Sequence, residues 1–209
     1  MLRTENSAVQ NASPVDRVGP YTYEKFIDRV RLFHSYAAPG VVVGGIMVDM
    51  AMEQIPEGIL YDVICETSSC LPDSVQLLTP CTVGNGWLKI VNLGRYAVSL
   101  YDKHEGSGVR VYLDPGKLGD WGEIRAWYLK LRGKQEQDSA LLQREICMAG
   151  RSIYTLHSVR IQPRYLTRRS KGAISVCSSC GEAYPVRGGE ICLGCQGKSP
   201  YESSSVRKE

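Results

Sequence analysis

The chain has 209 residues, of which 43% are hydrophobic and 22% are charged, and its formal net charge at pH 7 is +3. Residues 1–159 carry 16 basic and 18 acidic side chains, a net charge of −2, whereas residues 160–209 carry nine and four, a net charge of +5. The composition excludes a fully disordered chain, and no apolar run approaches the ~18 residues of a membrane span, so we expect a globular protein without a membrane partner.

The first part of the chain predicts two helices, a strand and the start of a third helix. Within residues 21–33 the apolar positions Tyr23, Phe26, Ile27 and Val30 recur at helical spacing, and Thr22 precedes them as an N-cap. After a break at residues 38–40, residues 41–55 are apolar almost all round, which predicts a helix buried in the core. Residues 59–66 are typical of a strand, and Pro72 with Asp73 indicates the next helix start.

The following segment predicts a sheet flanked by helices. Three β-like runs, residues 87–92, 96–102 and 109–113, are separated by glycine-containing turns and suggest an antiparallel meander. Helical patterns follow at residues 121–131 and 138–148, and residues 152–161 predict a returning strand. The expected fold class is therefore α+β, a mixed helix and antiparallel-sheet core with a small C-terminal domain of the zinc-ribbon kind.

We predict five segments. They are a flexible N-terminal arm (1–19), an α+β core (20–162), a basic linker (163–175), a zinc-binding module (176–197) and a disordered tail (198–209). The arm is polar and lacks the apolar region of a signal peptide. Eight cysteines without an export signal indicate a reducing cytoplasm, where thiols serve metals or chemistry.

The strongest motif is a pair of Cys-x-x-Cys turns, Cys177 with Cys180 and Cys192 with Cys195. Each turn directs two thiolates to one point, and two turns supply the four sulfurs that a closed structural Zn²⁺ site requires. Gly181 and Gly194 supply backbone freedom, and a turn at residues 185–189 would fold the intervening segment into a hairpin. A redox dithiol or a disulfide pair is the alternative interpretation.

The core offers three further candidates, all at the ends of predicted elements: His34, Cys70 and Cys81. A thiol at a helix N-terminus experiences the positive end of the helix dipole, which favours the thiolate of Cys70. Asp73 is either a further ligand or a cap of its own helix. The alternative is that the cysteines are packed core residues, as free cysteines commonly are.

Two stretches resemble the signature blocks of the family of FmdE, a subunit of formylmethanofuran dehydrogenase. The first is Phe-His-Ser-Tyr-Ala-Ala-Pro-Gly at residues 33–40, where the family has Phe-His-Gly-His-x-Cys-Pro-Gly. The second runs over residues 70–88 and contains Cys-Leu-Pro-Asp-Ser-Val-Gln, then Thr-Pro-Cys-Thr and a Gly-Asn-Gly turn. In the family these correspond to Cys-x-x-Asp-Ala-x-Gln, Thr-Gly-Cys-Thr and Gly-x-Gly. The resemblance spans roughly residues 20–197 and includes a C-terminal zinc-ribbon or treble-clef module.

This resemblance implies an intertwined homodimer with a cleft around the His and Cys positions. His34, Asp73 and Cys81 carry over as cofactor-binding candidates, and His34, Cys70 and Cys81 as catalytic candidates, around a second metal in the core cleft. Tyr36 and Ala38 stand where the family often has a second His and a Cys, and Pro80 stands where Gly is common. The chain therefore lacks two of the family's potential ligands.

Three functional hypotheses follow. The first is a metal-binding protein accessory to molybdenum- or tungsten-linked one-carbon or formate metabolism, with a structural zinc. The chain is too small, and has too few clustered cysteines, for a complete dehydrogenase with a pterin cofactor and iron–sulfur clusters. The second is an interaction module that binds nucleic acid or a partner protein through residues 160–171, which carry five cations and no acid, and the zinc module. The third is thiolate catalysis by Cys70 or Cys81 with His34 as base.

Overall fold

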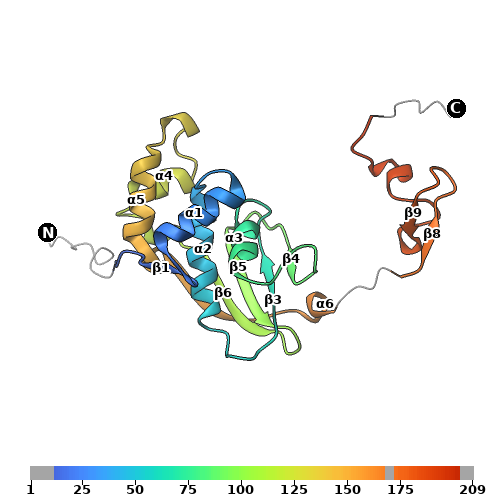
Figure 1. Ribbon diagram of the computed structural model, residues 1–209, viewed down its shortest axis with the longest axis horizontal. Coiled ribbons are helices and arrows are strands. Elements are labelled where there is room, and N and C mark those ends of the chain that lie inside the picture. Colours follow the sequence, from blue (N-terminus) through green and yellow to red (C-terminus); the bar gives the residue numbers. More distant parts are fainter. Residues whose placement is uncertain (1–11, 168–171, 203–209) are drawn as a thin grey trace. The chain divides into compact units, whose positions relative to one another are not determined.

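Helix α2 (Pro39–Met52) is the centre of the core, and ten of its residues are buried. In the computed structural model α2 packs on strands β5 (Ala97–Asp102) and β6 (Ser107–Leu113) (Figure 1). It also contacts helices α3 (Leu71–Leu78) and α5 (Ser139–Ala149). The predicted buried helix is confirmed. It begins earlier than expected, because Pro39 occupies a first-turn position, where its missing N–H is not needed. Residues 38–40 are therefore a helix start rather than a break.

The structure describes residues 12–167 and 172–202, and the chain divides into two compact units, residues 1–166 and 167–209. Within the described residues, no helix has the length and apolar character needed to cross a membrane. Mixed helices and sheet form the first unit, so the predicted α+β class is confirmed.

The helices of the first unit follow the predicted pattern closely. Helix α1 (Tyr23–His34) is capped by Thr22, whose hydroxyl accepts a hydrogen bond from the Lys25 backbone N–H at 3.4 Å. Asp138 caps α5 in the same way. The remaining helices are α3 (Leu71–Leu78), α4 (Gly122–Tyr128), α5 (Ser139–Ala149) and the single turn α6 (Pro163–Leu166), with short helical turns at Pro115–Lys117, Lys134–Glu136 and Gly150–Ile153.

A five-stranded sheet lies against these helices in the order β4-β3-β5-β6-β7 (Figure 1). Its strands are β3 (Tyr61–Cys65), β4 (Leu88–Ile90), β5 (Ala97–Asp102), β6 (Ser107–Leu113) and β7 (Tyr154–Arg160). β5 and β6 form an antiparallel hairpin, and β7 pairs antiparallel with β6 after the connection through α4 and α5. The prediction that residues 87–92 form the first strand of an antiparallel meander is wrong. This segment contains β4, which pairs in parallel with β3 at the sheet edge and does not pair with β5. The α3 crossover between β3 and β4 makes that parallel pairing possible.

The prediction that residues 1–19 form a flexible arm is wrong for the last of these residues. Arg17–Val18 form β1, which pairs with β2 (Tyr21–Thr22), and Val18 is fully buried. The Val15 backbone N–H also donates to the Cys147 carbonyl at 2.9 Å. Burial of Val18 holds this segment on the core, while residues 1–11 of the predicted arm lie outside the described residues.

The second unit is a small hairpin with two turns. β8 (Ile174–Val176) pairs with β9 (Ala183–Pro185), and helical turns follow at Val186–Gly188 and Gly194–Lys198. The hairpin is formed by residues 174–185, and the predicted turn at residues 185–189 follows it. Lys198 belongs to the last turn, so it is not part of a disordered tail, and residues 203–209 lie outside the described residues.

Candidate metal centre and core pocket

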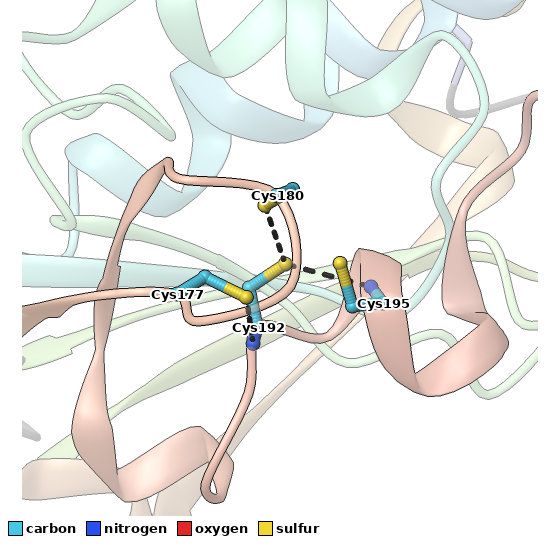
Figure 2. A group of neighbouring side chains, drawn as sticks. All are labelled: Cys177, Cys180, Cys192 and Cys195. Atoms are coloured by element: carbon cyan, nitrogen blue, oxygen red, sulfur yellow. Dashed lines mark hydrogen bonds between the residues drawn. The ribbon is translucent and has the colours of Figure 1, made fainter. Parts of the chain in front are cut away.

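The four cysteines of the second unit direct their sulfurs toward one another (Figure 2). Cys177 follows β8 directly, and Cys195 lies in the last helical turn. All four sulfur atoms lie within 4.8 Å of one another, and the Cys180 and Cys192 sulfurs are 3.7 Å apart. A tetrahedral Zn²⁺ with Zn–S bonds of about 2.3 Å places its sulfurs about 3.8 Å apart, so the donor set fits this ion.

Electrostatics within the cluster indicate that a cation is needed. Backbone N–H groups, first that of Cys192 at 3.4 Å, lower the pKa of the Cys177 thiol to about 6. For Cys180 the Glu182 N–H favours the thiolate, but desolvation and the other three sulfurs raise the pKa to about 12. The Cys177 thiolate therefore forms readily, and the neighbouring sulfurs oppose ionisation of Cys180. Zn²⁺ supplies the charge that allows all four to ionise.

Apart from this cluster the module has almost no core. Cys177 and Tyr184 are the only buried side chains among residues 172–202. The Tyr184 hydroxyl donates to the Glu190 carbonyl at 2.6 Å, and the Gln196 amide donates to the Ile191 carbonyl at 2.6 Å. These bonds close the loop that carries Cys192. Hydrogen bonds of this kind do not replace a hydrophobic core, so the module depends on its metal.

The first unit contains a cavity of about 860 Å³, the core pocket. Residues of both signature blocks line it, Tyr36 to Gly40 from the first and Cys70 from the second. Its wall also includes a group of aromatic rings and a group of cations: Tyr96, Trp127 and Tyr128, and Arg95, Lys130, Arg132 and Lys134. Among the residues that the structure describes, no carboxylate lines the pocket. Its volume lies in the range of pockets that hold one small organic ligand.

A glycine contact brings the two blocks together. A Cβ atom on Gly40 would lie 2.8 Å from the Cys70 Cβ and 2.9 Å from its sulfur, so only glycine permits this approach. The Tyr96 hydroxyl donates a short hydrogen bond to the Gly40 carbonyl, and a Cβ on Gly40 would also lie 3.2 Å from that hydroxyl. The start of α2 is therefore held between Cys70 and Tyr96, and both of these residues face the pocket.

His34 and Asp73 lie beside this contact as a hydrogen-bonded pair. His34 Nδ1 is 2.7 Å from Asp73 Oδ2, and the His34 ring packs against Tyr36 with ring centroids 5.3 Å apart. No side-chain hydrogen bond caps α3, so the capping alternative for Asp73 is wrong. The Asp73 carboxylate contacts His34, and its negative charge raises the pKa of the Cys70 thiol.

Cys81 does not join this group, which corrects the expectation of a single His34, Cys70 and Cys81 cleft. Cys70 precedes α3 and Cys81 follows it, and an eight-residue helix is about 12 Å long. The Cys81 sulfur is fully buried and lies 3.7 Å from the Tyr61 carbonyl of β3. Cys81 is a packed core thiol.

Cys70 is not an activated thiol either, contrary to the expectation from the helix dipole. Burial raises its pKa, the Asp73 carboxylate raises it further, and Lys130 only partly opposes them. Cys70 also has a positive φ of 53°, as do Ser35 (69°) and Lys130 (56°), and these are the only non-glycine residues with positive φ in the described part of the chain. All three are at the pocket or adjacent to a residue that lines it.

Sequence reasoning missed the pocket cations. Arg95 comes from the loop after β4, shortly after the second signature block, and the other three come from residues 130–134, far from both blocks in sequence. The basic run Lys-Leu-Arg-Gly-Lys at residues 130–134 was the available signal.

Comparison with known families decides the relationship. Residues 33–161, more than half of the chain, match the family "FmdE, Molybdenum formylmethanofuran dehydrogenase operon", and residues 168–202 match the "FmdE treble clef zinc finger". The chain belongs to the FmdE family. The resemblance found in the two signature blocks is thus confirmed, and the four-cysteine cluster is a zinc site of the treble-clef kind.

Two relatives extend this result. The crystal structure of a tungsten formylmethanofuran dehydrogenase FmdE-like protein from Syntrophus aciditrophicus is 53% identical, with a TM-score of 0.84, and the match covers 91% of this chain and 100% of that one. A probable S-adenosyl-L-methionine-binding protein of Archaeoglobus fulgidus is 28% identical in an alignment of 192 positions that covers 81% of this chain. This chain spans about half the length of that relative, 52%.

We expect one zinc ion per chain, bound by Cys177, Cys180, Cys192 and Cys195. Cys177→Ser should lose the zinc and expose residues 172–202 to protease, because metal binding and folding of the module are coupled. The thermal transition of the first unit should remain. Mass spectrometry of metal content and limited proteolysis measure both effects, with Cys147→Ser as the control that keeps the zinc. A Cys177→Ser, Cys195→Ser protein with full zinc content would contradict the assignment.

We expect the thiols of Cys70 and Cys81 to react slowly with iodoacetamide at pH 8. Burial raises the pKa of Cys81 to about 11, two units above the ordinary 9.0, which lowers its thiolate fraction about 100-fold. Burial raises the pKa of Cys70 as well. Labelling of each cysteine, followed by peptide mass spectrometry, should increase as the pH is raised toward these pKa values. Labelling of Cys70 that is faster than that of free N-acetylcysteine would restore the hypothesis of thiolate catalysis.

Proposed function

We propose that this chain is a cytoplasmic, zinc-stabilised accessory protein of molybdenum- or tungsten-linked one-carbon or formate metabolism, and that the core pocket is its functional site. The observation that supports this most is the assembly of both FmdE signature blocks in one pocket wall, at Gly40 and Cys70. The likeness to a protein described as tungsten formylmethanofuran dehydrogenase FmdE-like gives the metabolic context.

An accessory role suits the chemistry better than a complete dehydrogenase. Oxidation of a formyl group or formate requires a pterin-bound metal and an electron path through iron–sulfur clusters. In the described residues only one group of cysteines is close enough together to share a metal, and the zinc-finger match assigns it to zinc. Cys65, Cys70, Cys81 and Cys147 lie on separate elements and do not form a second group. The redox centres of such a reaction would therefore belong to other proteins of the complex.

Deletion of the gene tests this role. The specific activity of the molybdenum- or tungsten-dependent formate or formylmethanofuran dehydrogenase in cell extracts should fall in the deletion strain. The wild-type gene should restore it, and a Gly40→Val gene should not, because the added side chain would collide with Cys70. A Gly119→Ala gene is the matched control, since a Cβ there meets nothing within 4 Å. Unchanged activity in the deletion strain would contradict the proposal.

A second metal in the core stays part of the proposal. His34, Asp73 and Cys70 are the remaining candidate ligands, now without Cys81. Support comes from the 2.7 Å contact of His34 with Asp73 and from the charge interaction of Asp73 with the Cys70 thiol. A metal equivalent that survives Cys177→Ser and is lost in Asp73→Asn would support this site. A metal content of only the zinc equivalent in the wild type would reject it.

We also propose a homodimer. The first unit leaves several large apolar side chains exposed, including Leu32 (82% exposed), Leu131 (57%) and Phe33 (52%). Leu32 and Phe33 are neighbours in the last turn of α1, and exposed apolar side chains that lie together are typical of surfaces that a partner covers. Light scattering at micromolar concentration should give twice the mass of the chain, and a monomer would reject the proposal.

A second candidate function is an interaction module for nucleic acid or a partner protein. The zinc module exposes Val176 (66%) and Tyr201 (84%), which favours a protein surface over a purely structural domain. Arg164 of the basic linker packs over the Tyr165 ring, whereas Arg168, Arg169 and Lys171 lie outside the described residues. If nucleic acid is the partner, retention on a DNA column should fall steeply with salt and with removal of Arg164, Arg168 and Arg169. Unchanged retention would leave only the protein partner.

A further inference from the structure

The core pocket has an unusual balance of charge. Arg95 and Arg132 are paired outside it, with Glu66 at 2.7 Å and Glu123 at 2.6 Å respectively. Lys130 and Lys134 make no ion pair with any carboxylate in the described part of the chain. Since no Asp or Glu of residues 12–167 and 172–202 lines the cavity, its described wall presents two cations without an ion pair and two that are paired with a glutamate outside it. A cavity with this wall favours an anion.

The two unpaired lysines are combined with flat aromatic surfaces. The Lys134 ammonium lies 5.8 Å from the centroid of the Tyr36 ring, and the Lys130 ammonium lies 5.8 Å from that of Trp127. Both rings line the pocket. Each ammonium lies over the face of its ring, so a planar ligand that contacts the exposed part of either ring has a positive group close to its negative substituent. The wall therefore fits a flat ring that carries an anionic group.

We propose that the core pocket binds an organic anion built on a planar heteroaromatic ring, with Lys130 and Lys134 holding its phosphate or carboxylate and Tyr36 and Trp127 contacting the ring. The cavity of about 860 Å³ is large enough for a molecule of mononucleotide size. This inference rests on the proposed function only in taking the core pocket as the functional site. It also separates this pocket from a site for S-adenosyl-L-methionine, whose sulfonium and ammonium groups give it a net positive charge that the four cations disfavour.

Calorimetric titration of the full-length, zinc-loaded protein tests the proposal with matched pairs of probes. AMP and adenosine, FMN and riboflavin, and orotate and uracil each differ mainly in an anionic group. At least one anion should bind with a micromolar to submillimolar Kd, at least tenfold tighter than its neutral counterpart, and its binding should weaken as salt is added. AMP or FMN would identify a phosphate ligand, and orotate a carboxylate ligand. S-adenosyl-L-methionine should bind more weakly than the best anion.

Variants at exposed residues test whether the anion binds in the core pocket, and substitutions at such positions should leave the fold intact. Lys130→Gln with Lys134→Gln should weaken the anion at least tenfold and leave the neutral counterpart unchanged. Tyr36→Leu, at a half-exposed ring, should weaken both members of a pair. The control is Lys25→Gln with Arg144→Gln, two exposed cations outside the pocket wall, which should bind as the wild type does.

Several results would overturn the inference: no binding of any of the three anions at 1 mM, equal binding of anions and neutral counterparts, an unchanged Kd in the double lysine variant, or tighter binding of S-adenosyl-L-methionine. Such a failure together with loss of dehydrogenase activity in the deletion strain would reject the ligand class but keep the accessory role. The reverse outcome would keep the ligand class and reject the metabolic role.

Discussion

The close approach of helices α2 and α3 is the constraint on which the core depends. Gly40 and Gly44 lack the side chains that would keep the helices apart, since a Cβ on Gly44 would lie 2.4 Å from the Ser74 hydroxyl oxygen. That hydroxyl instead donates to the Val41 carbonyl at 2.9 Å, so a buried polar group is satisfied at the contact. This packing places Cys70 in the pocket wall, and Asp73, one turn further along, in contact with His34. Two signature blocks that are well separated in sequence thus form one site because small residues let two helices touch.

Features set by local sequence could be predicted, and features set by tertiary packing could not. The all-round apolar pattern of α2 and the spacing of the four zinc cysteines are local, and both predictions were confirmed. The sequence could not predict the partner of β4, because its short apolar pattern is compatible with pairing to either β3 or β5. The structure pairs it with β3. Cys81 could have been excluded from the cleft, because the predicted helix after Cys70 already separates the two thiols by its own length. Lys130 and Lys134 reach the pocket only through the packing of α4 and α5, which periodicity does not reveal.

The departures from the family pattern have a structural meaning in this pocket. Tyr36 and Ala38, which stand where the family often has His and Cys, both line the cavity. A phenol ring and a methyl group there replace two potential metal ligands with an aromatic and an apolar surface. Within the described residues the zinc cysteines form a group of close ligands, whereas His34, Asp73 and Cys70 do not form a second such group. In the first signature block of this chain Tyr36 and Ala38 form pocket wall, and His34 is its remaining candidate ligand.

Backbone strain in the first unit is concentrated at the same place. A non-glycine residue in the left-handed region costs about 1–2 kcal/mol, and Ser35, Cys70 and Lys130 each accept that cost. They belong to three separate segments, the ends of α1 and α4 and the start of α3, yet each lies at or beside the core pocket. Packing elsewhere must hold these conformations, and the α2–α3 contact does so for Cys70 by fixing it between Gly40 and its own helix. Unfavourable backbone that gathers around one cavity is typical of a binding site whose wall must keep a fixed shape before its ligand arrives. Lys130 takes its positive φ as the residue that closes the end of α4, where the Leu131 N–H donates to the Ala126 carbonyl at 2.9 Å, and this turn brings Lys130 to the pocket wall.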